Sequence, residues 1–339
     1  MWIAILLGVV PFWLWGQPTD CSQGRYFSPI FGQVNVDSDI QFGANLQPTL
    51  FNPLNVQDLF LDVYQPGGDN LSQRPLIIWA FGGAFVFGSR TNGDIVELAT
   101  QFSKMGYVNA AIDYRLTGAL AFNGNDSLAN VAVIKAMHDM RAAIRFFYKS
   151  AQQGNPYGID TNHIYIGGVS AGAITAVHTG YLNDLSEWPP QVDTTGFGGI
   201  AGNSGNPGYS DAVAGIINLA GGIGDTQWIQ AGEPPILSMH GDKDDVVPYG
   251  TDTVDLFNLG LLLHGSASVH EHAVRLGMRS ELYTYAGAGH VPFTQNNAQG
   301  PYMDTTINEI KTFLYPLVCG SAPPLAIDPT LPEALSVFP

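Results

Sequence analysis

The segment His163–Gly172, which reads HIYIGGVSAG, decides how the rest of the chain is interpreted. Its first seven residues form an apolar run typical of a buried strand, and the residues from Ala171 onward have apolar side chains at helical spacing. Between them, Gly168–Gly172 matches the pattern Gly-x-Ser-x-Gly. The glycines permit a tight strand-to-helix turn that raises the Ser170 hydroxyl above the sheet, where the helix N-terminus favours developing negative charge. We therefore interpret Ser170 as a nucleophile rather than as part of an ordinary turn.

Strands and helices are expected to alternate on both sides of this turn. The expected strands are apolar runs: Leu76–Phe81, Tyr107–Tyr114, His163–Val169, Val213–Leu219, Ile236–His240 and Glu281–Tyr285. The expected helices are amphipathic stretches: Asp94–Met105, Ser127–Gln152, Ala171–Asn183, Thr251–Leu263 and Met303–Leu314. Two further antiparallel strands are expected within Gln33–Tyr64. This order predicts one α/β domain over residues 17–320, with a mostly parallel sheet of about eight strands covered by helices on both faces.

A nucleophilic serine needs a base and an acid, and later loops supply candidates for both. The histidine is His290, in AGAGHVPF after the strand ELYTY. The acid lies in HGDKDDVVP after the strand ILSM, where Asp244 fits best and Asp242 and Asp245 remain alternatives. The order Ser170, Asp244, His290 is the one this kind of strand–turn–helix site requires.

Glycines after an earlier strand suggest where an oxyanion would be stabilised. Leu76–Phe81 runs into Gly82-Gly83-Ala84-Phe85, so the backbone N–H groups of Gly83, Ala84 and Ala171 are expected to converge on the oxyanion. Four aromatic residues are candidates for the substrate pocket, although each is equally explained as core: Phe85, Phe87, Tyr209 and Trp228.

The segments IIWAFGGAFVFG, AAIDYRL, IGGVSAGA, HGDKDDVVP and GAGH occur in that order. Together they resemble the α/β-hydrolase superfamily, and within it the carboxylesterase/lipase branch that includes hormone-sensitive-lipase-like esterases. The CSQGRY segment at Cys21 also resembles secreted bacterial esterases. One departure is Phe81, which stands where that branch usually has the histidine of HGGG.

The resemblance implies an α/β-hydrolase fold with Ser170, Asp244 and His290 as a catalytic triad. It implies a secreted serine carboxylesterase acting on small to medium esters, with a small-molecule ester as its partner. The alternatives are an acetylxylan- or feruloyl-type esterase acting on plant polysaccharide, a peptidase, and a catalytically inactive binding protein on the same fold. Neither a dinucleotide nor a nucleotide phosphate fingerprint occurs, so we expect no cofactor. The cluster His264, His270 and His272 lacks metal-ligand spacing and is interpreted as a solvated loop, so we expect no metal.

Composition restricts the partners. The 339-residue chain has 13 Lys and Arg against 29 Asp and Glu, a formal net charge of −16, and only 12% charged residues. Nucleic acid is excluded, since its binding depends on basic groups that release counterions from phosphates. An anionic membrane surface is disfavoured for the same reason, and the number of subunits cannot be read from the sequence.

The ends of the chain predict export. Residues 1–16 form an uncharged apolar run, shorter than the roughly 20 residues that span a bilayer, which we interpret as a signal peptide rather than a buried helix. After export to the periplasm or the medium, Cys21 and Cys319 are expected to pair, with two free thiols as the alternative. Residues 186–210 are rich in Gly and Pro and are expected to form either an insertion near the site, as a lid or a site loop, or a plain surface loop. Residues 321–339 contain five prolines and are expected to form a loosely attached tail.

Overall fold

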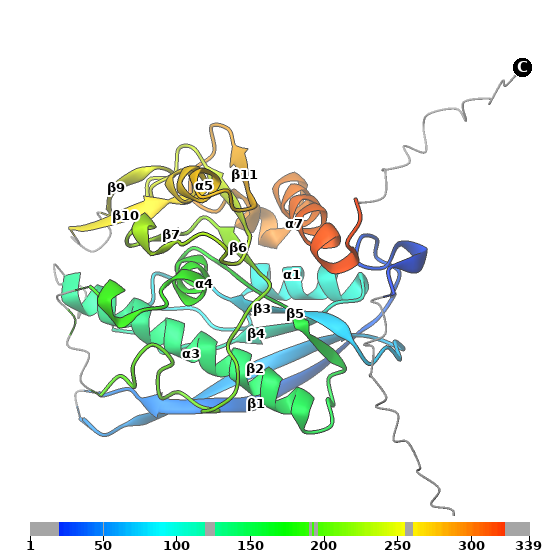
Figure 1. Ribbon diagram of the computed structural model, residues 1–339, viewed down its shortest axis with the longest axis horizontal. Coiled ribbons are helices and arrows are strands. Elements are labelled where there is room, and N and C mark those ends of the chain that lie inside the picture. The colour runs from blue at the N-terminus through cyan, green and yellow to red at the C-terminus, as the bar shows by residue number, and fades with distance from the viewer. Residues whose placement is uncertain are drawn as a thin grey trace, which may run out of the picture.

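An eight-stranded sheet runs through the molecule in the order β1-β2-β4-β3-β5-β6-β8-β11 (Figure 1). The computed structural model describes residues 20–49, 51–118, 126–189, 192, 196–254 and 260–322. β2 is antiparallel to both of its neighbours, and the strands from β4 to β11 are all parallel. The strands are β1 (Val34–Leu46), β2 (Val56–Pro66), β3 (Arg74–Ala80), β4 (Val108–Ile112), β5 (Ile159–Val169), β6 (Gly215–Leu219), β8 (Ile236–Gly241) and β11 (Ser280–Tyr285).

Helices cover both faces of this sheet. α3 (Asp126–Gln152), α4 (Ala171–Tyr181) and α5 (Ser266–Arg275) pack on one face, and α1 (Gly93–Lys104) and α7 (Pro301–Cys319) pack on the other (Figure 1). Every residue of β3, β4, β6 and β8 is buried, as expected for parallel strands enclosed between two helical layers. The predicted α/β class and the mostly parallel sheet are therefore confirmed. The short elements are α6 (Gln295–Ala298) and the 3-10 turns η1 (Ser22–Gly24), η2 (Leu185–Glu187), η3 (Thr226–Trp228) and η5 (Pro292–Thr294).

Two predictions of local structure after residue 250 are wrong. The expected helix Thr251–Leu263 is instead a pair of antiparallel strands, β9 (Thr251–Val254) and β10 (Leu261–Gly265), which join β7 (Gly222–Ile223) in a small second sheet. Leu262 is exposed while Leu263 is buried, which is the period-two pattern of a strand rather than a helix.

The segment with His264, His270 and His272, interpreted above as a solvated loop, instead forms parts of a strand and a helix. His264 lies in β10, whereas His270 and His272 lie on α5, whose buried residues Ser266, Val269 and Ala273 follow a helical spacing. The small and polar residues of this inner face hid the apolar periodicity. Among the described residues no group of three or more His, Cys, Asp or Glu side chains is arranged to hold a metal ion.

The described part of the Gly/Pro-rich segment 186–210 packs against α3. Ser204 Oγ donates to Asp139, and Arg145 donates to the carbonyl of Ala201. Residues 190, 191 and 193–195 of this segment lie outside the described residues, as do the signal peptide assigned to residues 1–16 and residues 323–339 of the tail.

Cys21 and Cys319 form a disulfide, with their Cα atoms 6.0 Å apart, so the predicted pairing is confirmed. The bond joins the segment before β1 to the end of α7 and closes a loop of 298 residues in sequence separation. Within the ranges that the structure describes, no helix combines the length and apolar character needed to cross a bilayer.

Candidate active site

Ser170 lies between β5 and α4, at the N-cap position of the helix, with φ 53° and ψ −117°. This left-handed backbone is unfavourable for a residue with a side chain and is a form of strain found at functional sites. Gly172 makes the turn possible, because a Cβ at this position would stand 2.1 Å from the carbonyl oxygen of Ala80. The local sequence therefore packs the start of α4 directly onto the end of β3.

The three predicted triad residues meet at the carboxyl ends of their strands. Ser170 Oγ lies 2.9 Å from Nε2 of His290, and Nδ1 of His290 lies 2.6 Å from Oδ2 of Asp244. Since a carboxylate only accepts hydrogen bonds, Nδ1 of His290 donates to it, which leaves Nε2 free to accept the serine proton. The arrangement has the geometry of a nucleophile, base and orienting acid.

Asp244 is the carboxylate that the structure brings to His290. Its side chain has no solvent exposure, and its Oδ1 accepts hydrogen bonds from the amides of Val246 and Val247, each at 2.9 Å. Burial alone would raise the pKa of Asp244, but hydrogen bonds from His240 and His290 outweigh it and hold that pKa well below its usual range. The alternatives lie elsewhere, since Asp242 accepts from the amide of Gly287 and Asp245 is exposed.

The loop after β3 approaches Ser170 with an unusual backbone. Gly83 has φ +131°, and Ala84 and Phe85 have φ values of 52° and 60°. A Cβ at Gly83 would stand 2.0 Å from the carbonyl oxygen of Phe87, so only glycine fits. Within the described chain, the amides of Gly83, Ala84 and Ala171 donate no hydrogen bond, which leaves three backbone donors near the serine.

Phe81, which stands at the histidine position of the HGGG pattern, is buried away from the site. Its ring stacks on Tyr114 with centroids 4.3 Å apart, and the Tyr114 hydroxyl donates to the carbonyl of Phe81 at 2.8 Å. The aromatic residue thus braces the base of the glycine loop.

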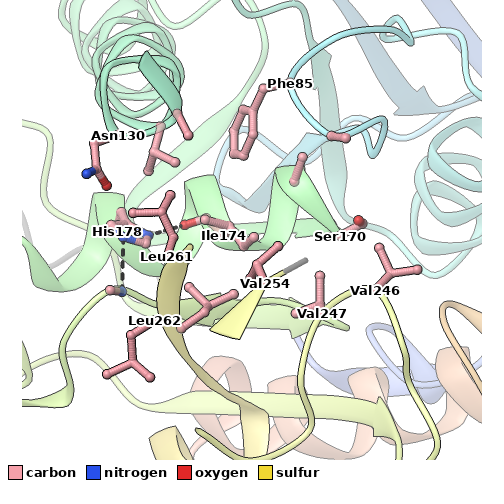
Figure 2. A pocket seen from close by; sticks show the side chains of 16 residues that line it. Phe85, Asn130, Ser170, Ile174, His178, Val246, Val247, Val254, Leu261 and Leu262 are labelled. Carbon is pink, nitrogen blue, oxygen red and sulfur yellow. Dashed lines mark hydrogen bonds between the residues drawn. The ribbon is translucent and has the colours of Figure 1, made fainter. Parts of the chain in front are cut away.

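An apolar cavity opens on one side of Ser170 (Figure 2). Figure 2 shows Ser170 at one end and Asn130 and His178 at the other, with aliphatic side chains between them. Its walls come from α3, α4, the loop after β3, the loop after β8 and the small sheet. Besides Ser170, the lining residues are Ala84, Phe85, Ala129, Asn130, Val133, Ala171, Ile174, His178, Gly224, Val246, Val247, Val254, Leu261, Leu262 and Leu263.

A second cavity opens on the other side of the serine and includes His290. Its lining is more polar, with Asn92, Asp94, Thr294 and Asn297 beside Gly82, Gly83, Phe87, Gly93, Val169, Val291 and Ala298. Burial raises the pKa of Asp94. Ser170, Ala84 and Val246 line both cavities, so the nucleophile stands at their junction.

The aromatic candidates divide into two groups. Phe85 lines the apolar cavity and Phe87, which is largely exposed, lines the polar one. Trp228 lines neither cavity, because its ring packs behind the wall against His178, with centroids 5.7 Å apart. Tyr209 also lines neither cavity.

Sequence reasoning did not identify His240 as part of this site. His240 is fully buried at the end of β8, and its Nε2 lies 3.0 Å from the same Oδ2 of Asp244 that His290 contacts. The only signal was its position four residues before Asp244 in HGDKD.

Comparisons with known proteins agree with this fold. Among solved structures, the apo form of Thermogutta terrifontis esterase 2 matches with a TM-score of 0.57 and 22% identity, covering 84% of this chain and 95% of that one. The same esterase phosphonylated by cyclosarin matches with a TM-score of 0.55 and 22% identity, covering 85% and 96% of the two chains. The chain has the α/β-hydrolase fold.

The BD-FAE family model matches residues 61–221 of this chain. Lipase 1 of Geotrichum candidum is 31% identical over 131 residues, which cover 37% of this chain and 22% of the lipase. Mouse carboxylesterase 3B is 32% identical over 154 residues, 43% of this chain and 24% of that protein. These matches confirm the resemblance to carboxylesterases and lipases. The chain spans less than a quarter of the length of these curated relatives.

Proposed function

We propose that this α/β-hydrolase is a serine carboxylesterase that hydrolyses small to medium carboxylic esters through an acyl-enzyme on Ser170. The observation that carries the proposal is the continuous hydrogen-bond chain from Ser170 through His290 to Asp244. The lipase and carboxylesterase relatives support the same reaction class.

In the proposed reaction, His290 takes the Ser170 proton while Oγ attacks the ester carbonyl. Asp244 remains ionised, fixes the tautomer of His290 and stabilises the imidazolium. The oxyanion accepts hydrogen bonds from the amides of Gly83, Ala84 and Ala171, and a donor of this kind typically contributes about 3 kcal/mol in the transition state. His290 then protonates the leaving alcohol, and water activated by His290 releases the acid.

The two cavities are proposed to divide the ester between them. The leaving oxygen must come within hydrogen-bond reach of His290, because this residue delivers its proton. The alcohol therefore belongs in the polar cavity that His290 lines, and the acyl chain belongs in the apolar cavity. The aliphatic walls of the apolar cavity favour an acyl chain that buries hydrocarbon surface.

We also propose that the protein acts after export, in the periplasm or outside the cell. The disulfide supports this location, because such bonds persist in oxidising compartments. The acidic net charge is compatible with a soluble enzyme that meets its substrate by diffusion.

The test combines labelling with turnover. Wild type and Ser170→Ala are treated with a fluorophosphonate and their intact masses are compared, and both are assayed on p-nitrophenyl esters from acetyl to palmitoyl. We expect a single adduct and ester hydrolysis with wild type, and neither with the variant. An unlabelled, inactive wild type would refute the esterase and favour a binding protein on the same fold.

The substrate panel separates the enzymatic alternatives. Acetylated xylan, a hydroxycinnamoyl ester and a peptide amide are assayed beside the simple esters. Faster turnover of the polysaccharide-derived esters would replace the small-ester proposal with a polysaccharide esterase, and amide cleavage would indicate a peptidase.

A further inference from the structure

Asp244 has two histidine partners rather than one. Its Oδ2 lies 2.6 Å from Nδ1 of His290 and 3.0 Å from Nε2 of His240. Its Oδ1 accepts from two backbone amides, so four hydrogen bonds surround a carboxylate whose side chain has no solvent exposure. The triad mechanism uses only the bond to His290, which leaves the role of His240 open.

The surroundings of His240 determine where its proton lies. Nε2 faces two acceptors at 3.0 Å, Oδ2 of Asp244 and the carbonyl oxygen of Val247. A lone pair at Nε2 would point at both oxygens, so Nε2 carries a hydrogen and donates it. On the other side of the ring, Nδ1 lies 2.7 Å from Ser266 Oγ, whose second acceptor, the carbonyl oxygen of Gly221, is farther away at 3.3 Å. Ser266 therefore donates to Nδ1 when the imidazole is neutral.

Ser266 is held in turn by a buried polar network. Nδ2 of Asn218 donates to Ser266 Oγ at 3.1 Å and to Ser238 Oγ at 3.0 Å, and Oδ1 of Asn218 accepts from the amide of Gly221. His240, Ser266, Asn218 and Ser238 are all fully buried. The network connects strands β6 and β8 and helix α5, so it holds the ring of His240 on its Nδ1 side, opposite Asp244.

We propose that His240 is a positioning residue for the catalytic acid, acting through the hydrogen bond from its Nε2–H to Oδ2 of Asp244. The inference rests on the proposed function, because its consequence is for the base His290. The bond prevents the carboxylate from turning away from His290. It also withdraws negative charge from Oδ2, which limits how strongly Asp244 favours the imidazolium form of His290.

The test compares two substitutions at His240. His240→Leu removes the donor, whereas a glutamine amide nitrogen carries two hydrogens for the two oxygens that Nε2 faces. We expect His240→Leu to lower kcat about tenfold with KM little changed, because the base is less well oriented. In the pH profile of kcat/KM, the acidic limb of His240→Leu should lie at higher pH than that of wild type, since Asp244 then stabilises the imidazolium of His290 more strongly. His240→Gln should restore most of kcat and the wild-type limb.

Two further variants control for packing. Ser266→Ala breaks the link behind His240 while leaving its bond to Asp244, and should give a smaller loss in kcat. His138→Leu replaces another buried histidine, one on α3 that lines neither cavity, and should leave kcat and the acidic limb unchanged.

NMR of 15N-histidine-labelled protein gives a readout that does not depend on turnover or on a variant that folds. We expect the 15N shifts of His240 in wild type to report a protonated Nε2 and an acceptor Nδ1. In variants that fold, the 1H chemical shift of the proton in the His290–Asp244 bond should change less in His240→Gln than in His240→Leu. An unprotonated Nε2, wild-type kcat and pH profile in His240→Leu, or a glutamine variant no better than leucine would each overturn the proposal. If wild type neither hydrolyses esters nor reacts with a fluorophosphonate, the esterase proposal fails, while the NMR result still decides the His240 hydrogen bond.

Discussion

Acidification should destabilise this protein through His178, a buried histidine on α4. Nδ1 of His178 lies 2.7 Å from the carbonyl oxygen of Ile174 and so donates to it, and Nε2 accepts from the amide of Gly224 at 3.3 Å. Both bonds are drawn in Figure 2. They require the neutral imidazole, because a second proton on Nε2 would face the N–H of Gly224.

The magnitude follows from the change in proton affinity on folding. Burial lowers the pKa of His178 from 6.5 to about 4. Since the folded value is depressed, His178 contributes its full share of stability above the unfolded value and loses it as pH falls from 6.5 towards about 4. The complete change corresponds to about 3 kcal/mol, of which about 2 kcal/mol falls between roughly pH 7 and pH 4.5.

The assay is urea unfolding at a series of pH values in that interval. Wild type is compared with His178→Gln, which cannot titrate, and with His270→Gln, a half-buried histidine on α5, as the matched control. The free energy of unfolding of wild type should exceed that of His178→Gln at neutral pH, and the difference should shrink by about 2 kcal/mol as the pH falls. The control should retain the wild-type pH dependence.

Other acid-sensitive groups do not obscure this comparison. Burial also lowers the pKa of His138, to about 3, but that contribution is common to wild type and variant. The stability from Asp244, whose pKa is held below its usual range, is lost only at more acidic pH. Parallel curves for wild type and His178→Gln would refute the reasoning, because they would mean that His178 takes up its proton without losing its contacts.

Three further outcomes can be checked. Removing the disulfide with Cys21→Ser and Cys319→Ser should lower the free energy of unfolding by up to about 5 kcal/mol, because the bond closes a loop of 298 residues, and should leave kcat unchanged. Thermal unfolding under non-reducing conditions and ester turnover measure the two effects, and an unchanged unfolding midpoint would contradict the first. Gly172→Ala should lower the free energy of unfolding by about 3 kcal/mol and abolish turnover, because the added Cβ would stand 2.1 Å from the carbonyl oxygen of Ala80. Gly250→Ala, whose Cβ has open space around it, should change neither stability nor turnover. Val133→Phe should slow butyryl and longer esters while sparing acetyl esters; equal losses across the chain-length panel would remove the acyl assignment of the apolar cavity.

The triad loops could be predicted because each one follows an apolar strand. Parallel strands end at the same edge of a sheet, so the order of the strand–loop units was enough to bring Ser170, His290 and the acidic loop together. Choosing Asp244 over its neighbours depended on the amides of Val246 and Val247, which only the folded loop brings to one carboxylate.

The segments that were predicted wrongly have ambiguous periodicity. Thr251–Leu263 contains apolar residues that suit either a helix or strands, and its pairing with β7 is a tertiary contact. α5 begins with small and polar residues, and its buried side includes Ser266 and His272, so hydrophobic spacing alone could not reveal it. The walls of the cavities combine elements from across the chain, so the sequence alone could not show which of the four aromatic candidates line them.

Val246 both holds Asp244 by a hydrogen bond and lines the two cavities. Its amide holds Oδ1 of Asp244 at 2.9 Å, and the residue lines both cavities. A ligand that displaces Val246 therefore also disturbs a hydrogen bond to Asp244, the proposed catalytic acid. A substitution of Val246 should therefore alter KM and kcat together. Val133 and Ile174 line the apolar cavity from α3 and α4, which do not hold Asp244, so substitutions there should change specificity with less effect on kcat.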